Sequence, residues 1–248
     1  MKITKWFLLA MLALLCCACS KNNPLAYVDE DADMVIYGNL EQVLEHKFWK
    51  KFEKTFKKTS EFKEFTKGLK DKLGVSLDEC GAKFALWGNM KEGEEPENLT
   101  CVIVFDEILA DDVIDALKED FEEKGEVDET TVDDCETYVF YRTWTAYDGK
   151  TKKRIEYSIA KIDKHIIQVF IESEPETIAK PKNKSALAKQ LDEDCIAGIA
   201  ISGDAICDVL EKELGIEDVP EIGDVVMMIY ADNSEIKLEA TVDISDMD

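Results

Sequence analysis

The sequence predicts an α+β fold, in which an antiparallel sheet carries helices packed on one face. Short stretches rich in β-branched and aromatic residues are separated by turn sequences, which is typical of strands joined as hairpins. Longer stretches between these hairpins have apolar residues at helical spacing. The order strand, long helix, strand, strand occurs as one complete and one shorter βαββ-type repeat. We therefore expect a sheet assembled from two related units.

The repeat also indicates how the 248 residues are divided. Residues 1–18 form a leader, and residues 19–28 form a polar tether. The first repeat unit covers residues 29–191, and the shorter second unit covers residues 192–248 in the same sheet. An Asp-rich stretch precedes the first strand of each unit, which supports this division.

The first strand is predicted at residues 34–37, where β-prone residues precede Gly38. Asp148 and Gly149, a strong hairpin signal, separate two of the later strands. Closely spaced strands of this kind favour antiparallel pairing. The further predicted strands cover residues 82–88, 99–105, 138–144, 155–162, 165–171, 195–201, 225–230 and 235–242.

The clearest helical pattern lies in residues 41–73, which we interpret as two helices in series. Leu44, Phe48, Phe52 and Phe56 recur at every fourth position, so they share one face of a helix. The lysines of the same segment then lie on the other faces. Three more helices are predicted at residues 109–121, 174–191 and 205–214.

The leader has the layout of a secretory signal peptide, because Lys2 and Lys5 precede an unbroken apolar run over residues 6–15. This run is too short for a permanent membrane helix, which takes about 20 residues. It is followed by Ala18 and Cys19, a small residue and a Cys, as at the processing site of bacterial lipoproteins. We expect Cys19 to become the lipidated N-terminus and to hold the chain in the cell envelope, at the outer membrane or on its periplasmic side.

The charge of the chain excludes some classes of partner. Residues 19–248 contain 28 basic and 54 acidic residues, a net charge of −26. Proteins bind nucleic acids largely by neutralising the phosphates with Lys and Arg. Because this chain is strongly acidic, we do not expect a nucleic acid as its partner. Such an acidic surface also repels anionic lipid head groups and favours solubility or basic partners.

The cysteines of the body do not suggest a complete disulfide framework. Five remain beyond the leader and the anchor, an odd number at wide spacings. Two of them stand in or beside apolar strand-like runs, where Cys behaves as a small hydrophobic residue. We expect most to be buried thiols, with one or two disulfides possible in an oxidising compartment. The sequence does not select pairs among Cys80, Cys101, Cys135, Cys195 and Cys207.

No catalytic or metal-binding motif stands out. The two histidines, His46 and His165, have no second His or Cys at the spacing of a zinc site. The alternating acids Asp29 and Asp31 resemble the start of a calcium loop, but the required later Gly and Glu are absent. The classical nucleophile-elbow, zincin and phosphate-loop motifs are also absent. We assign no catalytic residue, no metal and no cofactor.

The strongest candidate for an interaction surface is the basic aromatic segment at residues 47–72. It holds ten lysines and six aromatic residues in an otherwise acidic chain. Such a helix is suited to a membrane surface or an acidic partner. The alternative is that the aromatic side chains cover the sheet while the lysines are solvated. The candidate contact residues are Phe48, Trp49, Lys50 and Lys51.

The leader, the Asp-rich approach to residues 34–40 and the repetition of that unit resemble an uncharacterised group of bacterial secreted lipoproteins. These are domains of unknown function with repeated βαββ units of ferredoxin-like type. The resemblance implies a fold and an envelope location. The group has no established active site, so it implies no catalytic residue.

Three functions are compatible with the sequence. The first is an envelope-anchored lipoprotein with a non-enzymatic binding or structural role, whose partners are the membrane, through the lipid on Cys19, and another envelope protein. The second is an envelope hydrolase that uses paired carboxylates. The third is a lipid carrier that uses the concave sheet face beneath the helices. The absence of a catalytic constellation in the sequence favours the first.

Overall fold

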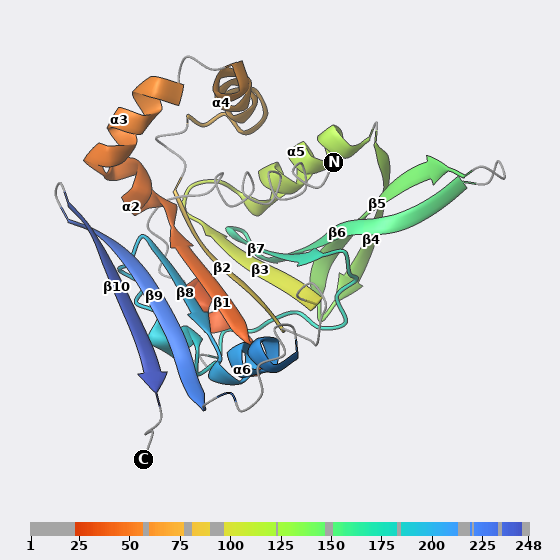
Figure 1. Cartoon of the computed structure of the whole chain (residues 1–248). Helices are drawn as coiled ribbons and strands as arrows, with labels where there is room; N and C mark the ends of the chain where they lie inside the picture. The colour runs from red at the N-terminus through yellow and green to blue at the C-terminus, as the bar shows by residue number, and fades with distance from the viewer. Residues whose placement is uncertain are drawn as a thin grey trace.

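Ten strands form a single antiparallel sheet in the order β10-β9-β8-β1-β2-β3-β7-β6-β5-β4 (Figure 1). The outermost strands, β10 and β4, are therefore far apart in the sheet. Most neighbouring strands are also close in sequence, as expected for hairpins, whereas β1 pairs with both β2 and the much later β8. The strands are β1 (Met34–Asn39), β2 (Ala82–Asn89), β3 (Glu97–Phe105), β4 (Gly125–Val132), β5 (Cys135–Thr145), β6 (Thr151–Asp163), β7 (Ile166–Ile171), β8 (Ala197–Ile201), β9 (Ile222–Asp232) and β10 (Glu235–Ile244).

The helices are few and short, and the longest is α4 with 14 residues. They are α2 (Leu40–Glu45), α3 (Lys47–Phe56), α4 (Ser60–Leu73), α5 (Ala110–Phe121) and α6 (Gly203–Lys212), with 3-10 turns η1 (Pro24–Tyr27) and η3 (Ala188–Gln190). None of the described helices has the length and apolar character needed to cross a bilayer. This computed structural model describes residues 23–56, 60–76, 81–89, 97–122, 124–146, 151–182, 185–212, 219, 221–232 and 235–244.

Helices α2 to α5 lie on one face of the sheet, which we call the helix side (Figure 1). Its core joins Val113, Ile114 and Phe121 of α5 to inward-facing residues of β3, β5, β6 and β7. Phe140 and Tyr157 stack with their ring centroids 4.5 Å apart, and Phe121 meets Phe140 edge-on at 5.3 Å. Helix α5 therefore seals the sheet above its β4 to β6 end.

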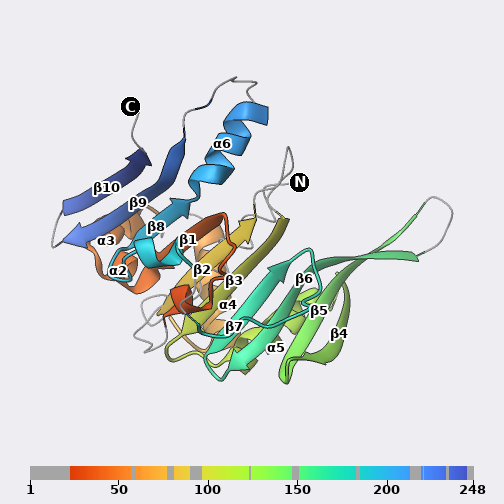
Figure 2. The ribbon, with the colours of Figure 1, turned by 90° about the horizontal axis from the view of Figure 1, so that it is seen from below.

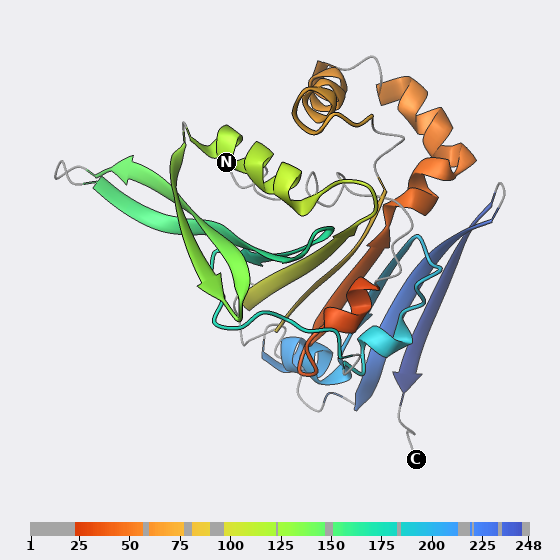
Figure 3. The same cartoon turned by 180° about the vertical axis from the view of Figure 1, so that it is seen from behind.

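The opposite face is covered by extended chain rather than by helices. Residues 172–182 and 185–191, which we call the strap, cross this face together with η1. Leu25, Tyr27 and Leu187 pack there against Val35 and Trp87 of the sheet. Figures 2 and 3 show the strap and η1 running along the side of the sheet away from α2 to α5. Central strands are consequently buried on both faces.

The predicted α+β class, with one complete and one shorter repeat under a helical layer, is wrong. One ten-stranded antiparallel sheet dominates the described chain, and its helices are few and short. The predicted helix at residues 174–191 is the strap, which contains only the turn η3. Strand β4, in contrast, was not predicted. The error arises because extended segments with well-placed apolar residues cover a sheet face as effectively as a helix does.

The segment predicted as the end of a tether is also part of the core. Leu25, Tyr27 and Val28 are each less than a tenth exposed. The Asn23 side chain caps η1 by accepting a hydrogen bond from the Leu25 amide at 2.9 Å. The Trp87 indole donates to Asp29 at 3.1 Å, which fixes the start of the Asp-rich stretch. The folded body therefore begins by residue 24.

Candidate functional site

Strands β9 and β10 carry a row of exposed apolar side chains on the helix side of the sheet. Met227 and Ile229 of β9 are 40% and 37% exposed, and Ile236, Leu238 and Val242 of β10 are 50–59% exposed. Cross-strand pairing places them on one surface, because residues directly opposite each other share a face. Leu238 pairs with Ile229 and Val242 pairs with Val225. We call this surface the open face.

The open face continues the face that the helices cover further along the sheet. From β9, Met227 pairs with Ile199 of β8, which pairs with Ile36 of β1. Ile36 in turn pairs with Leu86 of β2, and Leu86 packs in the core under the helices. Helix α2 contacts β2 and helix α5 contacts β4 and β6. The apolar face thus extends beyond the helical layer, which is unusual for a water-exposed surface.

The reverse side of β9 is well anchored, so the hairpin is held in place. Val226 is buried, and Met228 and Tyr230 pack against the strap-side core. The Tyr230 hydroxyl donates to the Asp192 carboxylate at 3.2 Å. Burial, and then the charge and hydrogen bond of Asp192, raise the pKa of Tyr230 to about 12. The exposed side chains of β9 therefore project from a fixed strand.

Strand β10 is the last strand of the sheet, so its outer edge has no described pairing strand. Its sequence alternates polar residues with Ile236, Leu238, Ala240 and Val242. On the polar side, Lys237 forms an ion pair with Glu239. A long apolar edge strand is normally protected against pairing with other chains, and this one is not covered in the described part of the molecule.

A cavity of about 860 Å³ lies on the strap side of the sheet. Acidic side chains from the Asp-rich stretch, from the turn between β4 and β5 and from the strap line it, but several of them have structural roles. Asp133 accepts the Ile178 amide at 2.9 Å, and Glu174 accepts the Tyr141 hydroxyl at 2.6 Å. These carboxylates hold the strap on the sheet, which is a different task from acid–base catalysis.

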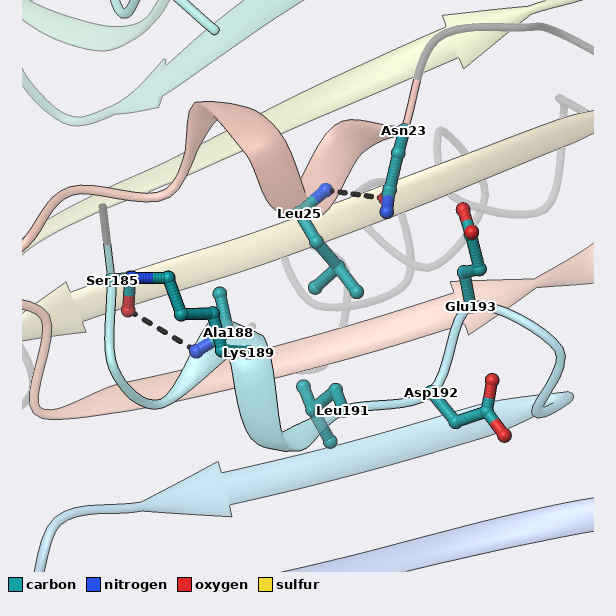
Figure 4. Close-up of a pocket in the computed structure, with 8 residues that line it drawn as sticks. All are labelled: Asn23, Leu25, Ser185, Ala188, Lys189, Leu191, Asp192 and Glu193. Carbon is teal, nitrogen blue, oxygen red and sulfur yellow. Dashed lines mark hydrogen bonds between the residues drawn. The ribbon is translucent and has the colours of Figure 1, made fainter. Parts of the chain in front are cut away.

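A smaller cavity of about 280 Å³ lies between η1 and η3. In Figure 4 the Asn23 side chain bonds the Leu25 amide and the Ser185 side chain bonds the Ala188 amide, so both polar groups serve as caps. Leu191 also lines this cavity (Figure 4). We interpret this cavity as the seam where the strap meets η1.

The structure separates the residues that the sequence proposed for interaction. Trp49 is partly buried and packs against the helix-side core, whereas Lys50 is exposed on α3. The side chains of Phe48 and Lys51 lie outside those that the structure describes, as does all of Cys19. Lipidation of Cys19 and binding through α3 stay predictions.

The cysteines and histidines described by the structure have structural surroundings. Cys101, Cys135, Cys195 and Cys207 are free thiols, and Cys101 and Cys195 are buried. Burial raises the pKa of both buried thiols to about 12, which keeps them protonated and unreactive. Cys80 lies outside the described residues.

His165 makes a hydrogen bond through Nδ1 to the Ile108 carbonyl at 2.9 Å, and His46 is partly buried. The contact of His165 ties its ring to the segment that precedes α5. Within the described ranges, no group of three or more His, Cys, Asp or Glu side chains is arranged to hold a metal ion.

The sequence predicts that β10 has one apolar face, but it does not predict that this face is exposed to solvent. The alternation in residues 235–242 indicates a strand with one apolar face. Such a pattern ordinarily means that the face is buried against another layer. Only the three-dimensional arrangement shows which helices meet each part of the sheet. Helices α2 and α5 contact β2, β4 and β6, whereas β9 is contacted by α6, and α2 to α5 stand away from β9 and β10 (Figure 1).

Comparison with known proteins gives only weak structural similarities. No family model and no curated protein matches the chain. A chain of TP0453 in its crystal form III shares 11% identity, with 92% of this chain and 82% of that chain covered and a TM-score of 0.46. In crystal form I of TP0453 the identity is 9%, the coverage 92% and 81%, and the TM-score 0.44.

Proposed function

We propose that this chain is a non-enzymatic, lipid-anchored protein of the cell envelope that binds another protein at β9 and β10. The leader and Cys19 support the location. The open face supports the binding role, and it is the observation that carries the proposal. Five large apolar side chains stay 37–59% exposed on one rigid surface at the end of the sheet.

The edge of β10 indicates how such a partner is recognised. Its backbone N–H and C=O groups are arranged to pair with an extended segment, which would extend the sheet by one strand. Alternate side chains of the added strand would lie beside Leu238 and Val242 on the open face. Because the chain is strongly acidic, the partner segment is expected to be neutral or basic on its polar side.

Site-specific photo-cross-linking in intact cells tests this proposal. A photoreactive residue at position 238 on β10 is compared with one at position 130, an exposed position on the opposite edge strand β4. We expect one protein adduct of defined mass from position 238, which Ile236→Asp abolishes. No adduct, or the same adducts from both positions, would contradict binding at β10.

A lipid carrier is the second candidate, because the open face lies on the side of the sheet where α2 to α5 stand. An acyl chain lying along Met227, Ile229 and Leu238 would remove their surface from water. Native mass spectrometry of the protein purified from envelopes would then detect a lipid adduct that Leu238→Asp removes. An apo mass for the wild-type protein would exclude this candidate.

A further inference from the structure

The hairpin of β5 and β6 extends beyond the rest of the sheet as a two-stranded ribbon. Strand β4 pairs with β5 only as far as Arg142, and β7 pairs with β6 only from Tyr157 onward. We call the projecting part of this hairpin the arm; it consists of residues 142–145 of β5 and 151–155 of β6. Over most of its length the two strands of the arm pair with each other and with no third described strand. Figures 1 and 3 show this end of β5 and β6 projecting past the molecule.

The arm is cationic, although the chain as a whole has a net charge of −24. The only two arginines of the chain, Arg142 and Arg154, stand opposite each other in its register. Lys152 and Lys153 follow one another on β6, and the arm contains no acidic residue. A local concentration of positive charge of this kind attracts an anionic partner even when the whole protein is acidic.

One face of the arm combines this charge with an exposed tryptophan. Trp144 pairs with Lys152, and two residues along, Arg142 pairs with Arg154, so the four side chains share a face. Trp144 is 44% exposed, and Lys152 and Arg154 are exposed as well. Among the described residues no ion pair involves Lys152 or Arg154. Their charges are therefore available to a partner.

The other cations of the arm are used within the fold. Arg142 donates to Glu156 at 2.8 Å, which holds the base of the arm. Lys153 points to the opposite face, where its ammonium lies 4.0 Å from the centre of the Tyr141 ring and 3.5 Å from Asp128. This division leaves a compact group of Trp144, Lys152 and Arg154 at the outer part of one face.

We propose that the arm binds the head groups of anionic lipids, with Trp144 entering the interface between water and hydrocarbon. Tryptophan favours that interface because its ring is apolar and its N–H is polar. Lys152 and Arg154 would neutralise lipid phosphates, which arginine contacts in a bidentate manner. An acidic protein could also pair with Lys152 and Arg154. It would, however, offer no apolar layer into which Trp144 could insert. This proposal is independent of a partner at β10.

Sedimentation with lipid vesicles tests the proposal on the mature chain, residues 19–248, carrying Cys19→Ser so that no acyl anchor forms. We expect binding to vesicles of phosphatidylglycerol and phosphatidylcholine, weakened by salt, and no binding to phosphatidylcholine alone. Lys152→Glu with Arg154→Glu should weaken binding by about tenfold or more. The control is Lys180→Glu with Lys182→Glu, the same charge change at exposed positions of the strap.

A second readout follows Trp144 itself. Lipids brominated on their acyl chains should quench part of the tryptophan emission of the wild-type protein, and Trp144→Phe should remove that quenching. Circular dichroism confirms that each variant is folded. No sedimentation with the anionic vesicles, or equal weakening by the arm and strap variants, would overturn the proposal. Binding to a soluble polyanion without binding to vesicles would overturn it equally.

Discussion

The two ends of the sheet bury their apolar side chains to very different extents. Near β5 and β6, Phe140 is fully buried, stacked on Tyr157 and closed over by Phe121 of α5. Near β9 and β10, the opposed residues Ile229 and Leu238 are 37% and 59% exposed. Strands at both ends have apolar residues on alternate positions. The difference therefore lies in what covers these side chains. Near β5 and β6 the sheet face is part of the core because α5 packs on it.

The largest expected effect comes from truncating one residue at each end. Phe140→Ala should lower the free energy of unfolding by about 3–5 kcal/mol, because it leaves a cavity beneath α5. Leu238→Ala should change it by no more than about 0.5 kcal/mol, as is usual for an exposed side chain. Urea denaturation of the two variants measures both values. Similar losses for the two would mean that the open face is buried in the folded protein.

A smaller effect is expected at the boundary between the ends. A Cβ added to Gly38 of β1 would lie 2.2 Å from the ring of Phe84, which stands opposite it in the register. Gly38→Ala should therefore cost about 1–3 kcal/mol through overpacking. The control is Gly68→Ala in α4, where a Cβ meets nothing within 4 Å and a gain of about 0.5–1 kcal/mol is expected.

Thermal unfolding distinguishes these two alanine variants. The midpoint should fall for Gly38→Ala and rise for Gly68→Ala, with the wild type between them. An unchanged midpoint for Gly38→Ala would show that the Phe84 ring moves aside without loss. In that case the boundary between the covered and the open parts of the sheet is more adaptable than the close approach implies.

The smallest effects concern one tyrosine on each side of the boundary. A hydrogen bond to Glu174, followed by burial, raises the pKa of Tyr141 to about 12, and Tyr230 has a pKa of about 12 beside Asp192. The unfolded chain loses these protons near the ordinary value of 10.0. The folded state binds them more tightly, so stability is constant below about pH 10 and falls as the pH rises towards 12.

Phenolate absorbance during an alkaline titration checks this expectation. Tyr141→Phe and Tyr230→Phe should each remove one late-titrating group from the folded protein. Each variant should also show a shallower loss of stability between pH 10 and 12 than the wild type. Ionisation of either tyrosine near pH 10 in the folded state would show that its hydrogen bond is not maintained in solution.

Much of the strand content was predictable, whereas the overall class was not. All nine predicted strands exist, and β2 extends the predicted residues 82–88 by only one position. Strand β4 was missed because its sequence is mostly polar, with Val127 packed against the helix-side core and Val132 against a smaller buried cluster. It is stabilised by pairing with β5, a contact that local composition does not reveal.

The strap shows why the helix prediction failed. Leu187 and Leu191 are buried and stand four residues apart, a spacing compatible with a helix. The backbone is instead held by distant side chains, since the Ile178 amide donates to Asp133 and the Ala179 amide donates to Gln168. Such long-range hydrogen bonds override local propensity. Exposure of Leu238 and of Trp144 was unpredictable for the same reason, because it depends on where other elements end.

The burial of η1 sets how far the folded body can move. Pro24 is already buried, and it stands only five positions after Cys19. Fully extended, five residues span roughly 17 Å. With the proposed anchor at Cys19, the domain is thus confined to a thin layer next to the bilayer. Weak contacts gain from such confinement, since the lipid surface is present at a high effective concentration and its encounter requires no search through solution.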